Sequence, residues 1–183
     1  MARLRLLDAE TAEPKARMLL EKIQAARGRT MNIFRAMANS PSAMQGFLSF
    51  KAALGNGVIG EALEEKIALL AAELNRCEYC VAAHMPAARK AGLDDQAISQ
   101  ARAGTASDKI EAAALRLAGL MIRHHGHIGD EEFAAARAAG LSDAQITEIV
   151  AHVALNIFTN YFNDVAKVEI DFPQVPLNPP MKE

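Results

Sequence analysis

Residues 65–84 read EKIALLAAELNRCEYCVAAH, and this stretch decides how the chain is interpreted. Its first half consists of residues with high helix propensity, and its apolar side chains recur at spacings of three and four. This pattern is interrupted at Arg76, and a second helical run starts at Cys77. The sequence therefore predicts two consecutive helices, over about 61–75 and 77–91, that pack antiparallel with a turn near Arg76.

The only two cysteines of the chain, Cys77 and Cys80, lie at the start of the second predicted helix. His84 follows one helical turn after Cys80, so all three side chains share one face of that helix. A thiol pair that can close to a disulfide beside an imidazole is typical of a redox centre. The same residues are also the minimum of a zinc site, and a non-enzymatic zinc-binding or assembly module is therefore an alternative.

Spacing alone does not decide which of the two sulfurs is the reactive one. Cys77 lies at a helix start, where unpaired backbone N–H groups lower the pKa of a thiol. Cys80 lies closer to His84, which can accept its proton or form an ion pair with its thiolate. Each sulfur thus has a different source of activation.

Glu65 is the other candidate site residue, because it interrupts an otherwise apolar face of the first helix. If the two helices turn near Arg76, Glu65 and His84 lie about one helical turn (~5 Å along the axis) apart. A direct or water-mediated hydrogen bond between them is then within reach. An acidic residue in the first turn of a helix is equally well explained without any partner.

Bulk properties exclude several classes of protein. The chain has 183 residues and a net charge of −2, which provides no electrostatic footprint for nucleic acid or an anionic membrane surface. No apolar run approaches the roughly 20 residues that a bilayer-spanning helix needs, and residues 1–10 contain no signal-peptide core. We therefore expect a cytoplasmic protein, and in that reducing compartment a cysteine pair is catalytic or metal-binding rather than structural.

The rest of the chain also reads as helix, so the predicted fold class is all-α. Alanine, leucine and glutamate are abundant, and no strict alternation of apolar and polar residues is sustained. We expect a single domain over residues 1–183, with an N-terminal helical arm over about 1–56. The proline-rich tail, about 171–183, is expected to lie extended over the surface of this chain or of a neighbouring subunit.

Two further groups of polar residues have simpler explanations. Three histidines at the end of a predicted helix interact favourably with its dipole, and we assign no metal to them. They are His124, His125 and His127. Three asparagines line one side of an otherwise apolar helix, and we expect their amides to bond neighbouring helices or subunits. They are Asn156, Asn160 and Asn163.

Residues 65–84, followed by ARKAGL at 88–93, resemble the core of the AhpD-like alkylhydroperoxidases, which belong to the carboxymuconolactone decarboxylase family. The second half, from AGLS at 139–142 to DFP at 171–173, is similar to the peroxidase-related branch. The resemblance covers most of the chain. It implies an AhpD-like helical fold, with the C-x-x-C at the start of a core helix, in a homo-oligomer that is trimeric or hexameric.

The resemblance also implies a function, the thiol-dependent reduction of organic hydroperoxides or hydrogen peroxide. In that scheme Cys80 attacks the peroxide, Cys77 is the resolving thiol, and His84 linked to Glu65 relays the proton. The implied reductant is a lipoyl-type dithiol carried by a partner, and no cofactor is implied. The family's other chemistry, decarboxylation of a lactone acid, uses no dithiol, so the intact cysteine pair counts against it.

Two residues depart from the family pattern. The best-characterised members have a histidine immediately before the second cysteine, where this chain has Tyr79. A tyrosine donates a hydrogen bond but is no base near neutral pH, so a relay step through that position is in question. Pro86 lies two residues after His84 and removes a backbone hydrogen bond, which predicts a kink there.

Overall fold

The computed structural model describes residues 2–180, and this part of the chain contains nine helices and no strand. The expected all-α fold is confirmed. The helices are α1 (Pro14–Arg27), α2 (Asn32–Met37), α3 (Pro41–Leu54), α4 (Glu61–Leu74), α5 (Glu78–Lys90), α6 (Asp95–Arg102), α7 (Lys109–Arg123), α8 (Asp130–Ala138) and α9 (Asp143–Ala166).

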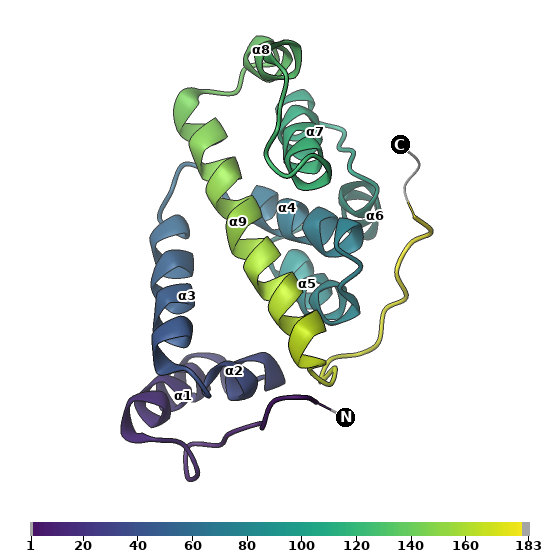
Figure 1. Cartoon of the computed structure of the whole chain (residues 1–183). Coiled ribbons are helices and arrows are strands. Elements are labelled where there is room, and N and C mark those ends of the chain that lie inside the picture. The colour runs from purple at the N-terminus through teal and green to yellow at the C-terminus, as the bar shows by residue number, and fades with distance from the viewer. Residues whose placement is uncertain (1, 181–183) are drawn as a thin grey trace.

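Helix α4 is the centre of the arrangement, because it packs against α5, α6, α7 and α9. Helix α9, the longest at 24 residues, runs diagonally across the molecule, with α3 on one side and α4–α6 on the other (Figure 1). Helices α7 and α8 lie at one end of α9, and α1 and α2 lie at the other end (Figure 1). Of the two predicted helices of the cysteine region, α4 thus lies in the interior, and α5 packs against it with its first turns buried.

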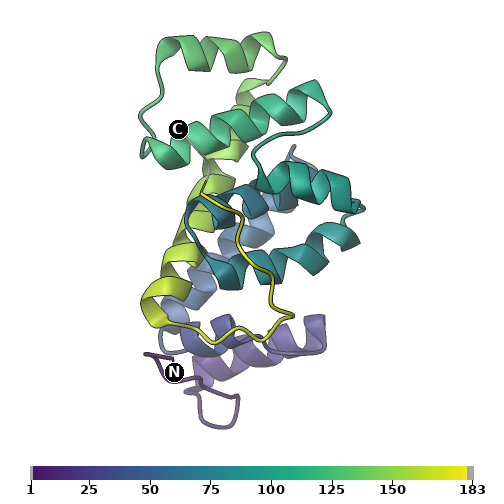
Figure 2. The same ribbon diagram turned by 90° about the vertical axis from the view of Figure 1, so that its right-hand side faces the viewer.

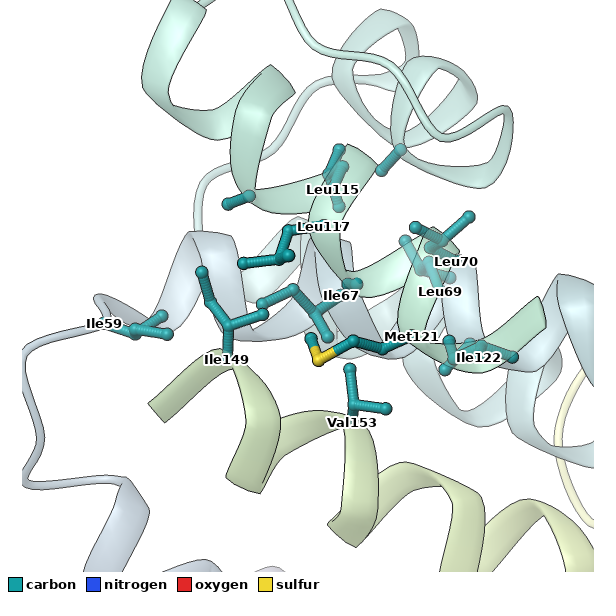
Figure 3. Packing of buried hydrophobic residues seen from close by; sticks show 14 of the residues in the cluster. Ile59, Ile67, Leu69, Leu70, Leu115, Leu117, Met121, Ile122, Ile149 and Val153 are labelled. Carbon is teal, nitrogen blue, oxygen red and sulfur yellow. The ribbon is translucent and has the colours of Figure 1, made fainter. Parts of the chain in front are cut away.

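Apolar residues lie on all sides of α4, and each of them is buried or partly buried against neighbouring helices. Ile67, Leu69 and Leu70 are each completely buried. Figure 3 shows them packed with side chains of α7 and α9, among them Leu115 and Ile149. A helix that is apolar on all sides is stable only when it is enclosed in this way, and α4 is therefore fixed in position.

A second apolar cluster surrounds the cysteine end of α5. It combines residues of α1, α2 and α3 with Cys77, Tyr79 and Cys80. The N-terminal helices thus cover the start of the cysteine helix. Helix α2 was not predicted, because its six residues are too few for a periodic apolar pattern to be recognised.

The C-terminal strap, residues 168–180, contains no helix and crosses the outer side of the α4–α5 region (Figure 2). Arg102 donates to the Pro176 carbonyl at 2.6 Å, and the Asn178 N–H donates to the Glu73 carboxylate at 3.0 Å. The Arg76 guanidinium donates to the Asn178 carbonyl at 2.7 Å. These bonds hold the strap against this chain.

Within residues 2–180, no helix has the length and apolar character that crossing a bilayer requires.

Candidate active site

A tight turn joins α4 to α5 at the position predicted from the sequence. Arg76 has a φ of 56°, in the left-handed region, and so reverses the chain direction. The Cys77 N–H donates to the Ala72 carbonyl at 2.9 Å, and the Arg76 N–H donates to the Glu73 carbonyl at 3.2 Å. This pair of bonds is a Schellman motif, with arginine where glycine is usual. The motif places Cys77 directly at the start of α5.

The two sulfurs occupy the first turn of α5 and form a disulfide. Cys77 is the N-cap residue, and its Sγ accepts from the Cys80 N–H at 3.2 Å. Both residues are nearly inaccessible, with 4% of Cys77 and 3% of Cys80 exposed. In the reduced protein, the unpaired N–H groups at this helix start favour a thiolate on Cys77.

Glu65 and His84 form the hydrogen bond that the spacing had placed within reach, and the alternative of an acid without a partner is excluded. The Nδ1 of His84 lies 2.7 Å from Oε2 of Glu65. With the carboxylate as acceptor, Nδ1 carries the hydrogen and Nε2 is left as the nitrogen with the free lone pair. His84 lies one turn after Cys80 on the same helix. The structure therefore places a histidine–carboxylate pair one helical turn from the two cysteines.

Burial and charge act in opposite directions on Glu65. Its burial raises the pKa of the carboxyl, whereas the charge and hydrogen bond of His84 lower it, as do the charges of Lys51 and Arg27. The attractions outweigh burial, and the pKa of Glu65 lies below its ordinary value. Glu65 is thus a buried carboxylate that remains ionised, which is the form able to orient and charge His84.

Asn163 of α9 contacts the sulfur of Cys80. Its Nδ2 donates to Sγ at 3.3 Å, and its Oδ1 is buried without a hydrogen-bond partner among residues 2–180. The predicted amide contacts are confirmed for Asn163 and for Asn160, which accepts from Asn75 of the α4–α5 turn. Asn156 instead bonds within its own helix, to the His152 carbonyl. The polar row on an apolar helix signalled these contacts, but it did not reveal that one partner is a cysteine.

Tyr79, between the cysteines, ties three segments together. Its hydroxyl donates to Asp171 of the strap at 2.7 Å and accepts from the Ile33 N–H of α2 at 3.2 Å. Burial, together with the Asp171 hydrogen bond, raises the pKa of Tyr79 above its ordinary value, so the phenol remains protonated. Tyr79 is therefore a structural tie and supplies no base. The sequence did not point to Asp171, because the contact joins positions far apart in the chain.

The remaining expectations concern Pro86 and the histidines of α7. Helix α5 continues without interruption through Pro86 to Lys90, and the kink expected at Pro86 stays a prediction. His124, His125 and His127 are all exposed at the end of α7. Within residues 2–180, no group of three or more histidine, cysteine or acidic side chains is arranged to hold a metal ion.

Comparison with protein families gives a match over residues 41–122, to the model described as the carboxymuconolactone decarboxylase family. This segment contains all four candidate residues, and the resemblance drawn from the sequence is confirmed. No curated protein sequence matches the chain.

Several solved structures share the fold. A peroxidase-related protein from Ralstonia eutropha JMP134, described as an alkylhydroperoxidase AhpD core, has a TM-score of 0.83 at 20% identity, covering 93% of this chain and 92% of its own. A peroxidase-related protein from Silicibacter sp. TM1040 has a TM-score of 0.78 at 22% identity, covering 90% and 91%. The C82A variant of the debrominase Bmp8, in complex with 2,3,4-tribromopyrrole, has a TM-score of 0.77 at 19% identity, covering 93% and 92%. The predicted AhpD-like fold is thereby confirmed.

Replacing Tyr79 with phenylalanine removes one hydroxyl and leaves the Ile33 N–H and Asp171 without it. We expect Tyr79→Phe to lower the free energy of unfolding by about 1–3 kcal/mol, measured by urea denaturation. Ser99→Ala is the control, because it removes a hydroxyl that is exposed on α6. It should change the free energy by less than about 0.5 kcal/mol. Equal effects of the two variants would contradict the role assigned to Tyr79.

The Glu65 carboxylate predicts a pH-dependent contribution to stability. Because the pKa of Glu65 is lower in the folded protein than its ordinary value of 4.5, its stabilisation is present above about pH 4.5. It is lost as the pH falls through the folded-state pKa. The difference in the free energy of unfolding between wild type and Glu65→Gln should therefore become smaller at lower pH. It is measured by urea denaturation at a series of pH values. Glu61→Gln, at an exposed carboxyl of the same helix, is the control. A wild-type excess that does not vary with pH would contradict this assignment.

Proposed function

Because the segment that holds the cysteine pair, residues 41–122, belongs to the carboxymuconolactone decarboxylase family, we propose that this protein is a thiol-dependent peroxidase. Its substrates are organic hydroperoxides or hydrogen peroxide, and its cycle alternates between the Cys77–Cys80 dithiol and disulfide. The observation that carries the proposal is the Glu65–His84 bond one helical turn from a cysteine pair. A buried carboxylate that orients an imidazole next to a nucleophile is the arrangement that general acid–base chemistry needs.

The first step is the attack of the Cys80 thiolate on one peroxide oxygen. The O–O bond breaks, Cys80 becomes a sulfenic acid, and the other oxygen leaves with a proton from protonated His84 as an alcohol or as water. Glu65 stabilises the protonated imidazole, as the buried carboxylate does in hydrolase triads. The Asn163 amide donates to the Cys80 sulfur, which favours its thiolate form before the attack.

The second step closes the disulfide. The Cys77 thiolate attacks the Cys80 sulfur, the S–O bond breaks, and hydroxide leaves and takes up a proton to form water. The N-cap position of Cys77 supports this role, because it favours the thiolate form of that residue. The short span between the two residues, with Cα atoms 5.3 Å apart, allows the bond to form without movement of the backbone.

Returning the protein to the dithiol requires an external reductant, for which we propose a dithiol of the lipoyl type. The cycle therefore fits a reducing compartment such as the cytoplasm. The same two electrons would serve another acceptor, and the structural likeness to the debrominase Bmp8 makes a brominated pyrrole the second substrate class to test. Lactone decarboxylation remains the less favoured alternative, since it would leave the cysteine pair without a role.

We propose that the protein is a homo-oligomer, trimeric or hexameric, and that the outer face of α9 contributes to its interface. Between Glu148 and Asp164 this helix carries no aspartate, glutamate, lysine or arginine. Large apolar side chains are exposed along it: Val150, Phe158, Tyr161 and Val165. A continuous apolar face of this kind is unusual on a monomer surface and is commonly covered by another chain.

Substitutions at the site should separate the roles of the residues. Cys80→Ser should abolish peroxide consumption, whereas Cys77→Ser should consume one equivalent and stop at the Cys80 sulfenic acid, detected by dimedone labelling and mass spectrometry. His84→Asn should lower the rate of oxidation by about 10²–10⁴-fold, because the proton donor is lost.

The control for His84 is His125→Asn, at an exposed histidine in the left-handed conformation that asparagine tolerates. This variant should oxidise at the wild-type rate. Full activity in Cys80→Ser would refute the peroxidase mechanism. Loss of activity in both histidine variants would refute the specific role of His84.

The oligomer proposal is tested by multi-angle light scattering. Wild type should have a mass that is three or six times the 19.7 kDa of one chain. Tyr161→Lys with Val165→Lys should lower this mass, because burying two lysines in an apolar interface is costly. Met18→Lys, at a residue that is 57% exposed on α1, should leave it unchanged. A monomeric wild type would contradict the proposal.

A further inference from the structure

A hollow of about 650 Å³ opens beside the cysteine pair. Its lining includes Cys77 and Tyr79 from the start of α5, and Asn163 from α9, but Cys80 is not among the lining residues. The two sulfurs therefore differ in their surroundings. Cys77 lines the hollow, whereas the sulfur of Cys80 lies behind Asn163, a lining residue whose amide it accepts from, and His84 follows Cys80 one helical turn later on α5.

The outer wall of this hollow is built by the C-terminal strap. Val168, Glu169, Ile170 and Gln174 line it. Between Ile170 and Gln174 of this wall, Asp171 accepts from Tyr79 and from the Asn32 N–H. These contacts fix the strap relative to the cysteines. The hollow is thus a feature of the folded chain with a defined wall.

Residues near the N-terminus make further contacts with Asp171 and with Phe172, which follows it. Arg29 donates to the Asp171 carbonyl at 2.8 Å and to its carboxylate at 3.1 Å. The guanidinium of Arg29 also lies 4.6 Å from the centre of the Phe172 ring, and the Tyr79 ring contacts the same ring edge-on. Farther along the strap, Asn178 is bonded to both Glu73 and Arg76. Gln174 therefore lies between two anchored points of the strap, and residues 168–170 lie between the end of α9 and the first of them.

The lining has mixed polarity and little net charge. Three carboxylates and two cations face the space, and one of each, Asp164 and Lys167, form an ion pair at 2.5 Å. Val168 and Ile170 add apolar surface. Glu78, next to Cys77, disfavours the approach of an anion. These features suit an uncharged, flexible molecule with an aliphatic chain.

We propose that this hollow is the docking site of the reductant, an uncharged aliphatic dithiol, and that the reductant attacks Cys77 and not Cys80. The inference rests on the proposed peroxidase function and assigns its two half-reactions to opposite sides of the cysteine pair. Peroxide reacts at Cys80 on the His84 side, and the dithiol reacts at Cys77 on the strap side.

The reduction then proceeds in two exchanges. One thiolate of the dithiol attacks the Cys77 sulfur, the Cys77–Cys80 bond breaks, and Cys80 leaves as a thiolate that accepts from Asn163. The second thiolate of the dithiol attacks the dithiol's own sulfur in this mixed disulfide. The cyclic disulfide of the reductant is released, and Cys77 leaves as a thiolate at the helix N-terminus. Two electrons pass to the protein, and the two protons of the dithiol pass to the cysteines or to water.

The first test fills the hollow. Protein in the disulfide form is mixed with dihydrolipoamide. The appearance of free Cys77 and Cys80 thiols is followed by rapid alkylation and mass spectrometry of the protein. Gln174→Trp should lower the second-order rate constant about tenfold or more, because the bulky ring prevents in-line approach to Cys77. Gln96→Trp, at an exposed position of α6 outside the hollow, should reduce at the wild-type rate. Equal rates for the two tryptophan variants would overturn the proposal.

The second test identifies the attacked sulfur. The reduced single-cysteine variants Cys80→Ser and Cys77→Ser are each treated with a pyridyl disulfide that carries an uncharged amide chain of lipoyl length. For each variant, the rate constant with the pyridyl disulfide is divided by its rate constant with iodoacetamide. This ratio corrects for the different nucleophilicity of the two thiolates. The corrected rate should be about tenfold higher for Cys77 than for Cys80, since only Cys77 borders the hollow. The reverse order would overturn the assignment.

The third test addresses the class of the ligand. Dihydrolipoate, the anionic counterpart of dihydrolipoamide with the same dithiol, should reduce the wild-type disulfide more slowly than dihydrolipoamide at equal thiolate concentration, because Glu78 disfavours an anion. Equal rates would refute an uncharged-ligand site. None of the three tests uses a peroxide, so their failure is distinguishable from a failure of the peroxidase function, which would appear as a lack of oxidation by peroxide.

Discussion

The antiparallel packing of α4 on α5, fixed by the turn at Arg76, is the constraint on which the rest of the site depends. Because α4 is enclosed on all sides, it cannot shift along its axis without exposing apolar surface. The turn then sets where α5 begins, and so places Cys77 at a helix N-cap. The same register brings Glu65 opposite His84. One backbone motif thus determines both the environment of the sulfurs and the pairing of the proton-transferring groups.

Much of this register could be predicted from the sequence. The change of pattern at Arg76 and the helical spacing of Cys77, Cys80 and His84 are local signals. Counting residues from the turn placed Glu65 within reach of His84 but left an acid without a partner equally open. The contacts that close the site are of another kind. Asn163 and Asp171 come from segments more than 80 residues away, and no local pattern encodes which partner they meet.

The polar groups around the cysteines have distinct tasks. Glu65 remains ionised and orients His84, whereas Tyr79 remains protonated and ties the strap to α2. A tyrosine at this position therefore transfers no proton but builds part of the wall of a hollow. In the proposed cycle each sulfur also has its own hydrogen-bond donor, the Asn163 amide for Cys80 and the Cys80 N–H for Cys77. Thiolates can thus be stabilised at both positions as the disulfide opens and closes.

The most direct test of the central claim is a titration of the fully reduced, metal-free protein with a hydroperoxide in the absence of any reductant. Alkylation of the remaining thiols and peptide mass spectrometry then count the products. The account predicts that one equivalent of peroxide converts each chain to the Cys77–Cys80 disulfide and releases one equivalent of alcohol. Two free thiols per chain after exposure to excess peroxide would contradict it.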